Sequence, residues 1–245
     1  MDATTGGLTD AQQQAVSQTE GPVLVLAGPG SGKTTVVTRR ISHLIESGIP
    51  PWQILALTFT NKAAGEMRDR VLALIDEEKV NVRGLTVSTF HAFCARILRE
   101  WGDRIIGTCT FTIYDTSDQK SAVKEAIKAC DLSDSNWRPA SVLAAISTAK
   151  NKLIDPVTFE SEAYDFYSKS IAKLYRSYDE ILRGNDAVDF DDLLMKTAQL
   201  LQRDEEVRGN LEDRYRYVMI DEYQDTNHTQ FVIADKIAAK HRNIC

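Results

Sequence analysis

Short apolar runs alternate along this chain with longer segments in which apolar residues recur every three or four positions. The runs have the length of buried strands, and the longer segments have the spacing of amphipathic helices. In the first part of the chain the predicted strands cover 23–26, 54–59 and 85–88, and a predicted helix follows each of them. Three successive strand–helix units predict a parallel α/β sheet with right-handed crossovers.

The pattern changes in the middle of the chain, where residues 115–185 contain no convincing strand. Helices are predicted over 117–130, 139–150 and 156–183. Aromatic residues on the last of these helices are expected to form a packing stripe; they are Tyr164, Phe166, Tyr167, Tyr175 and Tyr178. This stretch is interpreted as an all-helical insertion into the α/β domain.

The α/β pattern then resumes with helices from Asp189 to about Tyr215, a strand over 217–220 and a helix over 229–240. We therefore predict the first part of the α/β domain at 1–114, the inserted helical subdomain at 115–187 and the second part at 188–245. A further strand begins at 243–245, so we expect the sequence to be truncated there. A short helix over 8–17, with Thr9 or Asp10 as its N-cap, precedes the first strand.

Composition restricts the class of protein only broadly. Apolar residues make up 43% and charged residues 26% of the chain, as in ordinary globular proteins. The net charge of −6 argues against a generally basic nucleic-acid surface, although a local groove can still be positive. The four cysteines and four histidines show no ligand spacing, so we expect reduced thiols and no structural metal. No apolar segment has the length of a membrane span and no secretory signal is visible, so we expect a cytoplasmic protein.

A glycine-rich turn follows the first predicted strand and matches the phosphate-binding loop of nucleotide-binding proteins. Backbone N–H groups in such a loop and the N-terminus of the next helix bind phosphate oxygens. Lys33 can reach the β- and γ-phosphates, and the Thr34 hydroxyl can bind Mg²⁺. Ala27 stands where the pattern has glycine, a small departure. The predicted nucleotide-binding residues of this loop are Ala27, Gly28, Pro29, Gly30, Ser31, Gly32, Lys33, Thr34 and Thr35.

A pair of acids ends the predicted strand at 217–220 and supplies what the loop lacks. Ligands of open α/β sheets bind at the carboxyl ends of the strands, where Asp221 and Glu222 are expected to lie. Asp221 is suited to hold Mg²⁺, and Glu222 is suited to orient and deprotonate an attacking water. We therefore predict Lys33, Asp221 and Glu222 as catalytic residues, and Thr34 and Asp221 as Mg²⁺ ligands.

Taken together, six motifs in order resemble the N-terminal part of superfamily 1 DNA helicases of the UvrD/Rep/PcrA type. The motifs begin at Leu8, Ala27, Thr58, Thr86, Asp189 and Ile220, and they span nearly the whole chain. The resemblance implies a RecA-like P-loop fold, ATP and Mg²⁺ as cofactors, and single-stranded and partly duplex DNA as substrates. It also implies a 3′–5′ motor with possible repair or replication partners.

The resemblance assigns further residues on the nucleotide side. Gln12 resembles a glutamine that reads the adenine edge, whereas the residues alone favour a solvated helix position. Gln224 is expected to couple the nucleotide site to DNA. Thr35 replaces an arginine that commonly helps to hold the base in these helicases, which is a departure from the family pattern.

On the DNA side, the resemblance assigns base stacking to Phe59 and Phe190, for which a core position is the alternative. Backbone contacts are assigned to Thr60, Asn61, Lys62, Thr89 and His91. A backbone-bonded histidine at a helix start is the alternative for His91.

We therefore expect the N-terminal motor domain of an ATP-dependent DNA helicase, which alone hydrolyses ATP poorly because the second motor domain with its arginine fingers is absent. The alternatives are the amino part of a helicase–nuclease, or a DNA- or protein-binding module that uses nucleotide only structurally. A GTPase is disfavoured because Asn61-Lys62-Ala63-Ala64 lacks the aspartate that reads guanine. A small-molecule kinase would not need the six motifs.

Overall fold

The structure, a computed structural model, describes residues 7–75, 82–133 and 136–245. The chain divides into two compact units. The first unit contains Met1–Phe93, Asp204–Thr226 and Ala234–Cys245, and the second contains Cys94–Arg203 and Asn227–Ile233. The predicted boundaries at 114 and 187 remain a prediction. No helix in the described ranges is long and apolar enough to cross a bilayer.

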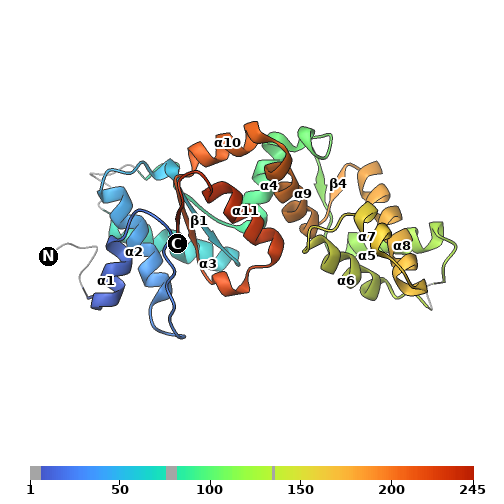
Figure 1. Cartoon of the computed structure of the whole chain (residues 1–245), viewed down its shortest axis with the longest axis horizontal. Helices are drawn as coiled ribbons and strands as arrows, with labels where there is room; N and C mark the ends of the chain where they lie inside the picture. Colours follow the sequence, from blue (N-terminus) through green and yellow to red (C-terminus); the bar gives the residue numbers. More distant parts are fainter. Residues whose placement is uncertain (1–6, 76–81, 134–135) are drawn as a thin grey trace. The chain divides into compact units, whose positions relative to one another are not determined.

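The first unit is built on a parallel sheet with the strand order β2-β1-β5-β6. Figure 1 labels β1 of this sheet and the helices α1, α2 and α3 of the same unit. Its strands are β1 (Ile54–Thr58), β2 (Thr86–Thr89), β5 (Tyr217–Ile220) and β6 (Asn243–Ile244). Its helices include α1 (Asp10–Ser17), α2 (Lys33–Glu46), α3 (Asn61–Leu74) and α10 (Glu205–Arg214). The helices α4 (Phe90–Trp101) and α11 (His228–Ala238) begin in one unit and end in the other. The predicted parallel α/β sheet is therefore confirmed.

One face of this sheet packs against α2 and α3. Alternate residues of β1 and β5 belong to that core, namely Ile54, Ala56, Tyr217 and Met219, because successive side chains of a strand point to opposite faces. All five residues of β1 are buried, as expected for a strand covered on both faces. The buried core therefore fixes the positions of the carboxyl ends of β1 and β5.

The predicted buried strand at 23–26 is wrong. These residues form no strand, and the side chains of Leu24 and Leu26 are 70% and 84% exposed. Val23 donates one backbone hydrogen bond to the Ile244 carbonyl, at 2.8 Å. A strand needs a backbone partner along its length, and β6 at this edge is only two residues long. The apolar run therefore has the composition of a core strand without the neighbour that would bury it.

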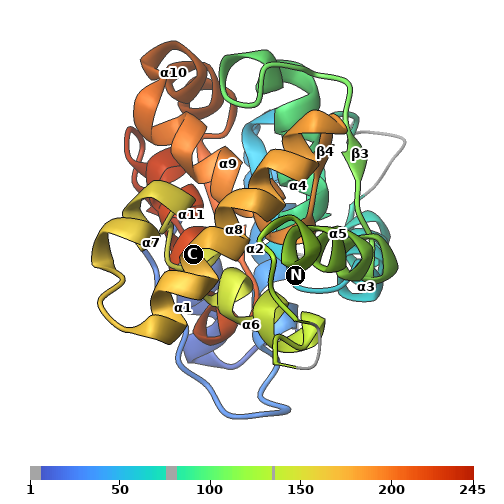
Figure 2. The same ribbon diagram turned by 90° about the vertical axis from the view of Figure 1, so that its right-hand side faces the viewer.

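The second unit is mainly helical and contains α5 (Thr116–Ala129), α6 (Pro139–Lys150), α7 (Pro156–Glu162), α8 (Phe166–Gly184) and α9 (Phe190–Arg203). Figure 2 shows α5, α6, α7 and α8 gathered together. Buried apolar side chains of α5, α6 and α8 form one core, against which Phe159 of α7 packs. Two strands that the sequence did not predict, β3 (Thr112–Ile113) and β4 (Ala187–Val188), pair in parallel beside it.

The predicted helix over 156–183 is wrong in its continuity. The chain leaves the helical conformation after Glu162 and restarts at Phe166, because Asp165 caps α8 by accepting from the Ser168 N–H at 2.7 Å. The packing stripe is confirmed for Tyr175 and Tyr178, which are fully buried. It is wrong for Tyr164 and Phe166, which are exposed. Tyr167 is also exposed, but its ring stacks on that of the buried Trp137 with the centroids 5.5 Å apart, so it packs in part as predicted.

Two leucine substitutions test whether residues 23–26 are buried in the sheet, as predicted from the sequence, or exposed, as in the structure. We expect Leu55→Ala in β1 to lower the free energy of unfolding by about 2–5 kcal/mol, because it opens a cavity in the sheet. Leu26→Ala should change it by less than about 0.5 kcal/mol, because that side chain is exposed. Denaturant titration measures the free energy of unfolding of both variants. Equal losses would show that Leu26 is buried and would contradict the exposed conformation of residues 23–26.

Candidate functional site

Parallel pairing brings the ends of β1, β2 and β5 to one edge of the first unit. Leu57 of β1 lies opposite Ile220 of β5, and Thr58 lies opposite Thr89 of β2. The Asp221 N–H continues this pairing by donating to the Leu57 carbonyl at 3.1 Å. Residues that follow the strands in sequence therefore share this edge, although they lie far apart in the chain.

The phosphate-binding loop reaches α2 through two glycines in the left-handed region. Gly30 has φ 74° and Gly32, the N-cap of α2, has φ 85°. Side chains rarely adopt this conformation, and a Cβ on Gly32 would also lie 3.0 Å from Nε2 of Gln12. The helix starts at Lys33, so its positive N-terminal end faces the loop, where an anion is favoured.

The two predicted Mg²⁺ ligands meet. The Thr34 hydroxyl donates to Oδ2 of Asp221 at 3.2 Å, although 187 positions separate the residues. Burial raises the pKa of Asp221, the bond from Thr34 opposes this shift and the neighbouring Glu222 adds to it, so the net change is upward. A nearby cation would favour the charged carboxylate, and hard cations prefer oxygen ligands. The donor set therefore fits Mg²⁺.

A pocket of about 760 Å³ lies over the loop. Its lining includes most of the loop from Ala27 to Thr35, together with Glu222 and Gln224 from the other motif. Lys33 Nζ donates to the carbonyls of Ala27 and Gly28, at 3.2 and 3.3 Å, so the ammonium group lies over the loop. The pocket volume falls in the usual range for small-molecule and cofactor sites. The loop and Glu222 therefore line one cavity, and Asp221 reaches its edge through the bond from Thr34, as the sequence predicts for a nucleotide site.

Glu222 has an unusual backbone conformation. Its φ of 55° and ψ of 46° are left-handed, which is rare for a residue with a side chain. The Gln224 side-chain amide donates to the Glu222 carboxylate. Local strain of this kind is common at functional sites, where the surrounding structure maintains it.

Arg70 also lines the pocket, and the sequence interpretation missed it. It lies on α3 and forms an ion pair with Glu66 at 3.7 Å. The available signal was the spacing of Lys62, Glu66 and Arg70, which places these charges on one face of a helix.

Gln12 connects α1 to the phosphate-binding loop. Its Oε1 accepts from the Thr9 N–H at 2.9 Å, and its Nε2 donates to the Ser31 carbonyl at 2.9 Å. Thr9 is the N-cap of α1, one of the two predicted candidates. The role of Gln12 in reading adenine stays a prediction.

Most of the predicted DNA-contacting residues lie at the same edge as the nucleotide pocket. Phe59 follows β1, is half-buried and has its ring 6.0 Å from that of Phe90. Thr60 caps α3 by accepting from the Ala63 N–H at 3.1 Å. Asn61 and Lys62 start that helix and are exposed. The half-buried Phe59 is therefore followed directly by polar residues of a kind suited to contacts with a DNA backbone.

The remaining predicted DNA-contacting residues differ in accessibility. Thr89 is only 7% exposed, and its hydroxyl accepts from the Ala92 N–H at 3.2 Å. His91 is half-buried in the first turn of α4. Phe190 is the first residue of α9 in the second unit and is 46% exposed. The structure therefore groups all of these residues except Phe190 at the strand ends of the first unit.

The parallel sheet, the glycine-rich loop and the Thr34–Asp221 contact define a P-loop nucleotide-binding fold of the RecA-like type. Residues 8–245 match the UvrD/REP helicase N-terminal domain, so this chain belongs to the UvrD/REP helicase family.

Relatives of the chain carry the name ATP-dependent DNA helicase PcrA. The protein from Staphylococcus epidermidis is 43% identical over 246 aligned positions, and that from Staphylococcus aureus is 42% identical. The alignment covers all of this chain and 33% of each relative, so the chain spans about a third of their length.

Alanine substitutions at two glycines, one in the loop and one in a helix, test the left-handed conformation of Gly32. We expect Gly32→Ala to lower the free energy of unfolding by about 1–2 kcal/mol, because alanine is strained at positive φ. The contact with the flexible end of Gln12 adds little. Gly209→Ala, inside α10 and with no atom near the new methyl group, should raise it by about 0.5–1 kcal/mol. Thermal melts compare them, and a stabilising Gly32→Ala would contradict the left-handed N-cap.

Proposed function

We propose that the chain is the ATP-binding motor domain of an ATP-dependent DNA helicase. The contact between Thr34 and Asp221 carries this proposal, because it joins two motifs from opposite ends of the chain at one pocket. The same pocket holds the phosphate-binding loop and Glu222. Family membership and the names of the relatives support the same function.

Each residue at the pocket has a task that follows from its chemistry. Backbone N–H groups of the loop and the N-terminus of α2 bind phosphate oxygens. Lys33 exchanges its contacts with the Ala27 and Gly28 carbonyls for the phosphates. Thr34 and Asp221 hold Mg²⁺, which supplies charge neutralisation on the phosphates when bound. Glu222 orients the attacking water and accepts its proton.

DNA binds at the residues that the family resemblance assigns to it. Phe59 and, in the second unit, Phe190 stack on unpaired bases, a contact that tolerates any sequence and contributes about 1–3 kcal/mol per base. Contacts with the phosphate backbone are assigned by the family resemblance to Thr60, Asn61, Lys62, Thr89 and His91. Single-stranded and partly duplex DNA are the proposed substrates, with repair or replication proteins as partners. Movement in the 3′–5′ direction rests on the family resemblance alone.

The first prediction concerns nucleotide binding by the chain itself. We expect the chain to bind Mg-ATP weakly and Lys33→Ala to weaken that binding about tenfold or more, because a charge-assisted hydrogen bond contributes about 1.5–3 kcal/mol. Titration with a fluorescent ATP analogue measures the affinity. Lys120→Ala, an exposed lysine of α5, is the matched control and should bind like the parent chain. Equal affinities in all three proteins would refute the phosphate role of Lys33.

The second prediction concerns hydrolysis. In the complete helicase, Glu222→Gln should slow DNA-stimulated ATP turnover by about 10²–10⁴-fold while Mg-ATP still binds, because the amide cannot accept the proton. Steady-state turnover and nucleotide titration separate the two effects. Glu162→Gln, at the exposed end of α7, serves as the control. Should the Glu222→Gln protein turn over normally with binding intact, Glu222 is not the base.

The arginine fingers expected from the second motor domain accelerate comparable phosphoryl transfers about 10³–10⁵-fold. We therefore expect the 245-residue chain alone to hydrolyse ATP slowly. Robust DNA-stimulated turnover by the chain would contradict the need for a second domain.

A further inference from the structure

The second unit contains a buried ionic cluster that the proposed chemistry does not use. Lys150, the last residue of α6, is completely buried, and its Nζ lies 2.7 Å from Oδ2 of Asp189 and 2.8 Å from Oδ2 of Asp192. The Tyr178 hydroxyl donates to Asp189 at 2.9 Å. Burial alone would lower the pKa of Lys150, but the two carboxylates raise it well above its usual value. The two carboxylates therefore favour the charged form of Lys150 in the core of this unit.

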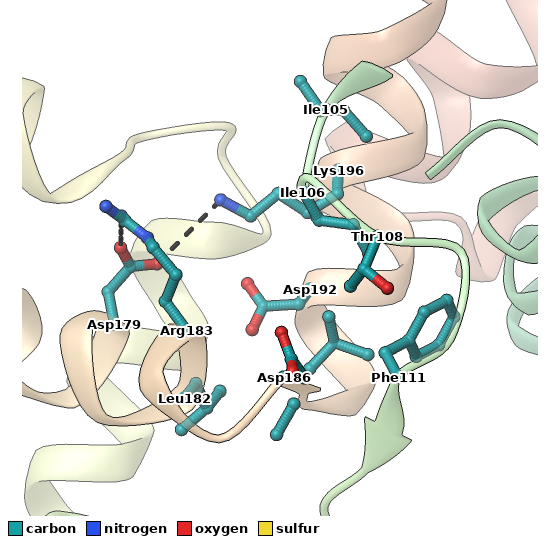
Figure 3. Close-up of a pocket in the computed structure, with 12 residues that line it drawn as sticks. Ile105, Ile106, Thr108, Phe111, Asp179, Leu182, Arg183, Asp186, Asp192 and Lys196 are labelled. Carbon is teal, nitrogen blue, oxygen red and sulfur yellow. Dashed lines mark hydrogen bonds and ion pairs between the residues drawn. The ribbon is translucent and has the colours of Figure 1, made fainter. Parts of the chain in front are cut away.

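The two aspartates of this cluster also form the start of α9. The Asp192 N–H donates to Oδ1 of Asp189 at 2.7 Å, and the Asp189 N–H donates to Oδ2 of Asp192 at 3.2 Å. This reciprocal arrangement is a capping box. Figure 3 shows the Asp192 carboxylate among the residues that line a pocket of about 260 Å³. Lys150 therefore fixes both ends of the first turn of α9.

Phe190 lies inside this box. Asp189 precedes it, and Asp191 and Asp192 follow it. The third acid is also anchored, because the Asn151 side-chain amide donates to Oδ1 of Asp191 at 3.0 Å. Lys150 and Asn151 are consecutive residues at the end of α6. Together they bond to all three acids beside Phe190: Lys150 pairs with Asp189 and Asp192, and Asn151 bonds to Asp191.

Asn151 has a second partner at the start of another helix. Its Oδ1 accepts from the side-chain amide of Asn227, and Asn227 in turn caps α11 through reciprocal bonds with Gln230. The Thr229 hydroxyl donates to the backbone carbonyl of Asn151 at 3.0 Å. The end of α6 is therefore held in place from both α9 and α11.

The ring at the centre of these contacts is nevertheless accessible. Phe190 is 46% exposed, whereas Leu193 and Leu194 in the next turn are buried. An aromatic group that stacks on bases must be accessible on its face and fixed at its base, because a loose site loses the benefit of preorganisation. Phe190 is partly exposed, and the acids on both sides of it are anchored.

We propose that Lys150 and Asn151 are positioning residues that hold Phe190 as a stacking platform for an unpaired DNA base. The proposal rests on the proposed function, in which Phe190 contacts single-stranded DNA. Neither Lys150 nor Asn151 touches the base; each acts through the acids beside Phe190.

The test uses Asn151, because removing Lys150 would leave two buried carboxylates unpaired and would destabilise the fold. The 245-residue chain is titrated at low salt with a single-stranded oligonucleotide that carries 2-aminopurine, whose fluorescence falls when it stacks. Asn185→Ala is the matched control. Asn185, like Asn151, follows the last residue of a helix and donates to the carbonyl four residues back, at 2.8 Å in both cases.

We expect Phe190→Ala to weaken DNA binding about tenfold and to reduce the quenching. Asn151→Ala should weaken binding about fivefold with a matching loss of quenching, and Asn185→Ala should bind like the parent chain. In a chain that already carries Phe190→Ala, Asn151→Ala should have no further effect. That dependence on Phe190 separates positioning from a general loss of structure, which circular dichroism melts monitor.

The contrary outcomes fall into two groups. If Phe190→Ala binds DNA normally, the DNA role of Phe190 fails and this proposal fails with it. Only the positioning role is overturned if Phe190→Ala weakens DNA binding but Asn151→Ala does not. The same conclusion follows if Asn151→Ala weakens binding equally in a chain that already carries Phe190→Ala. Should Asn151→Ala fail to fold, Asp191→Ala removes the same bond from the other side, and the same two criteria apply to it.

Discussion

The parallel pairing of β1 with both β2 and β5 is the constraint on which the site depends. Because all three strands run in the same direction, everything that follows them in sequence collects at one edge. Asp221 reaches Thr34 only because the end of β5 is held in register beside β1. The same register places Phe59 and His91 at that edge, so one sheet positions both the residues proposed for nucleotide and those proposed for DNA in the first unit.

The acidic part of the site is unfavourable on its own. Asp221 is 8% exposed and its pKa is raised, and Glu222 beside it is held in a left-handed conformation. Such features destabilise a fold unless surrounding contacts maintain them. The backbone bond from Asp221 to Leu57 and the bond from Thr34 do so here. A bound cation would remove much of the remaining cost, which explains why the arrangement suits a metal-assisted reaction.

The sequence predicted well those features that depend on neighbours within a few residues. The phosphate-binding loop, the strand at 217–220 and the helix over 139–150 are local patterns, and the structure contains all three. The strand at 23–26 could not be decided in this way, because its burial depends on a partner more than 200 positions away. The break before α8 was different: Asp165 followed by Ser168 is a local cap signal, which the aromatic pattern concealed. The spacing of Lys62, Glu66 and Arg70 indicated a shared helix face, but only the folded chain shows that this face reaches the pocket.

The buried cluster of the second unit cannot be explained by stability alone. A buried ion pair repays the removal of its charges from water only when the geometry is excellent, and apolar replacements of equal volume are often as stable. Apolar side chains cannot form the hydrogen bonds and ion pairs that join Lys150, Asp189 and Asp192. Those bonds also cap α9, so the ionic cluster fixes both the position and the rotation of its first turn. An apolar core would bury α9 without specifying which side of that turn presents Phe190, and the proposed stacking of DNA bases on this ring would need that specification.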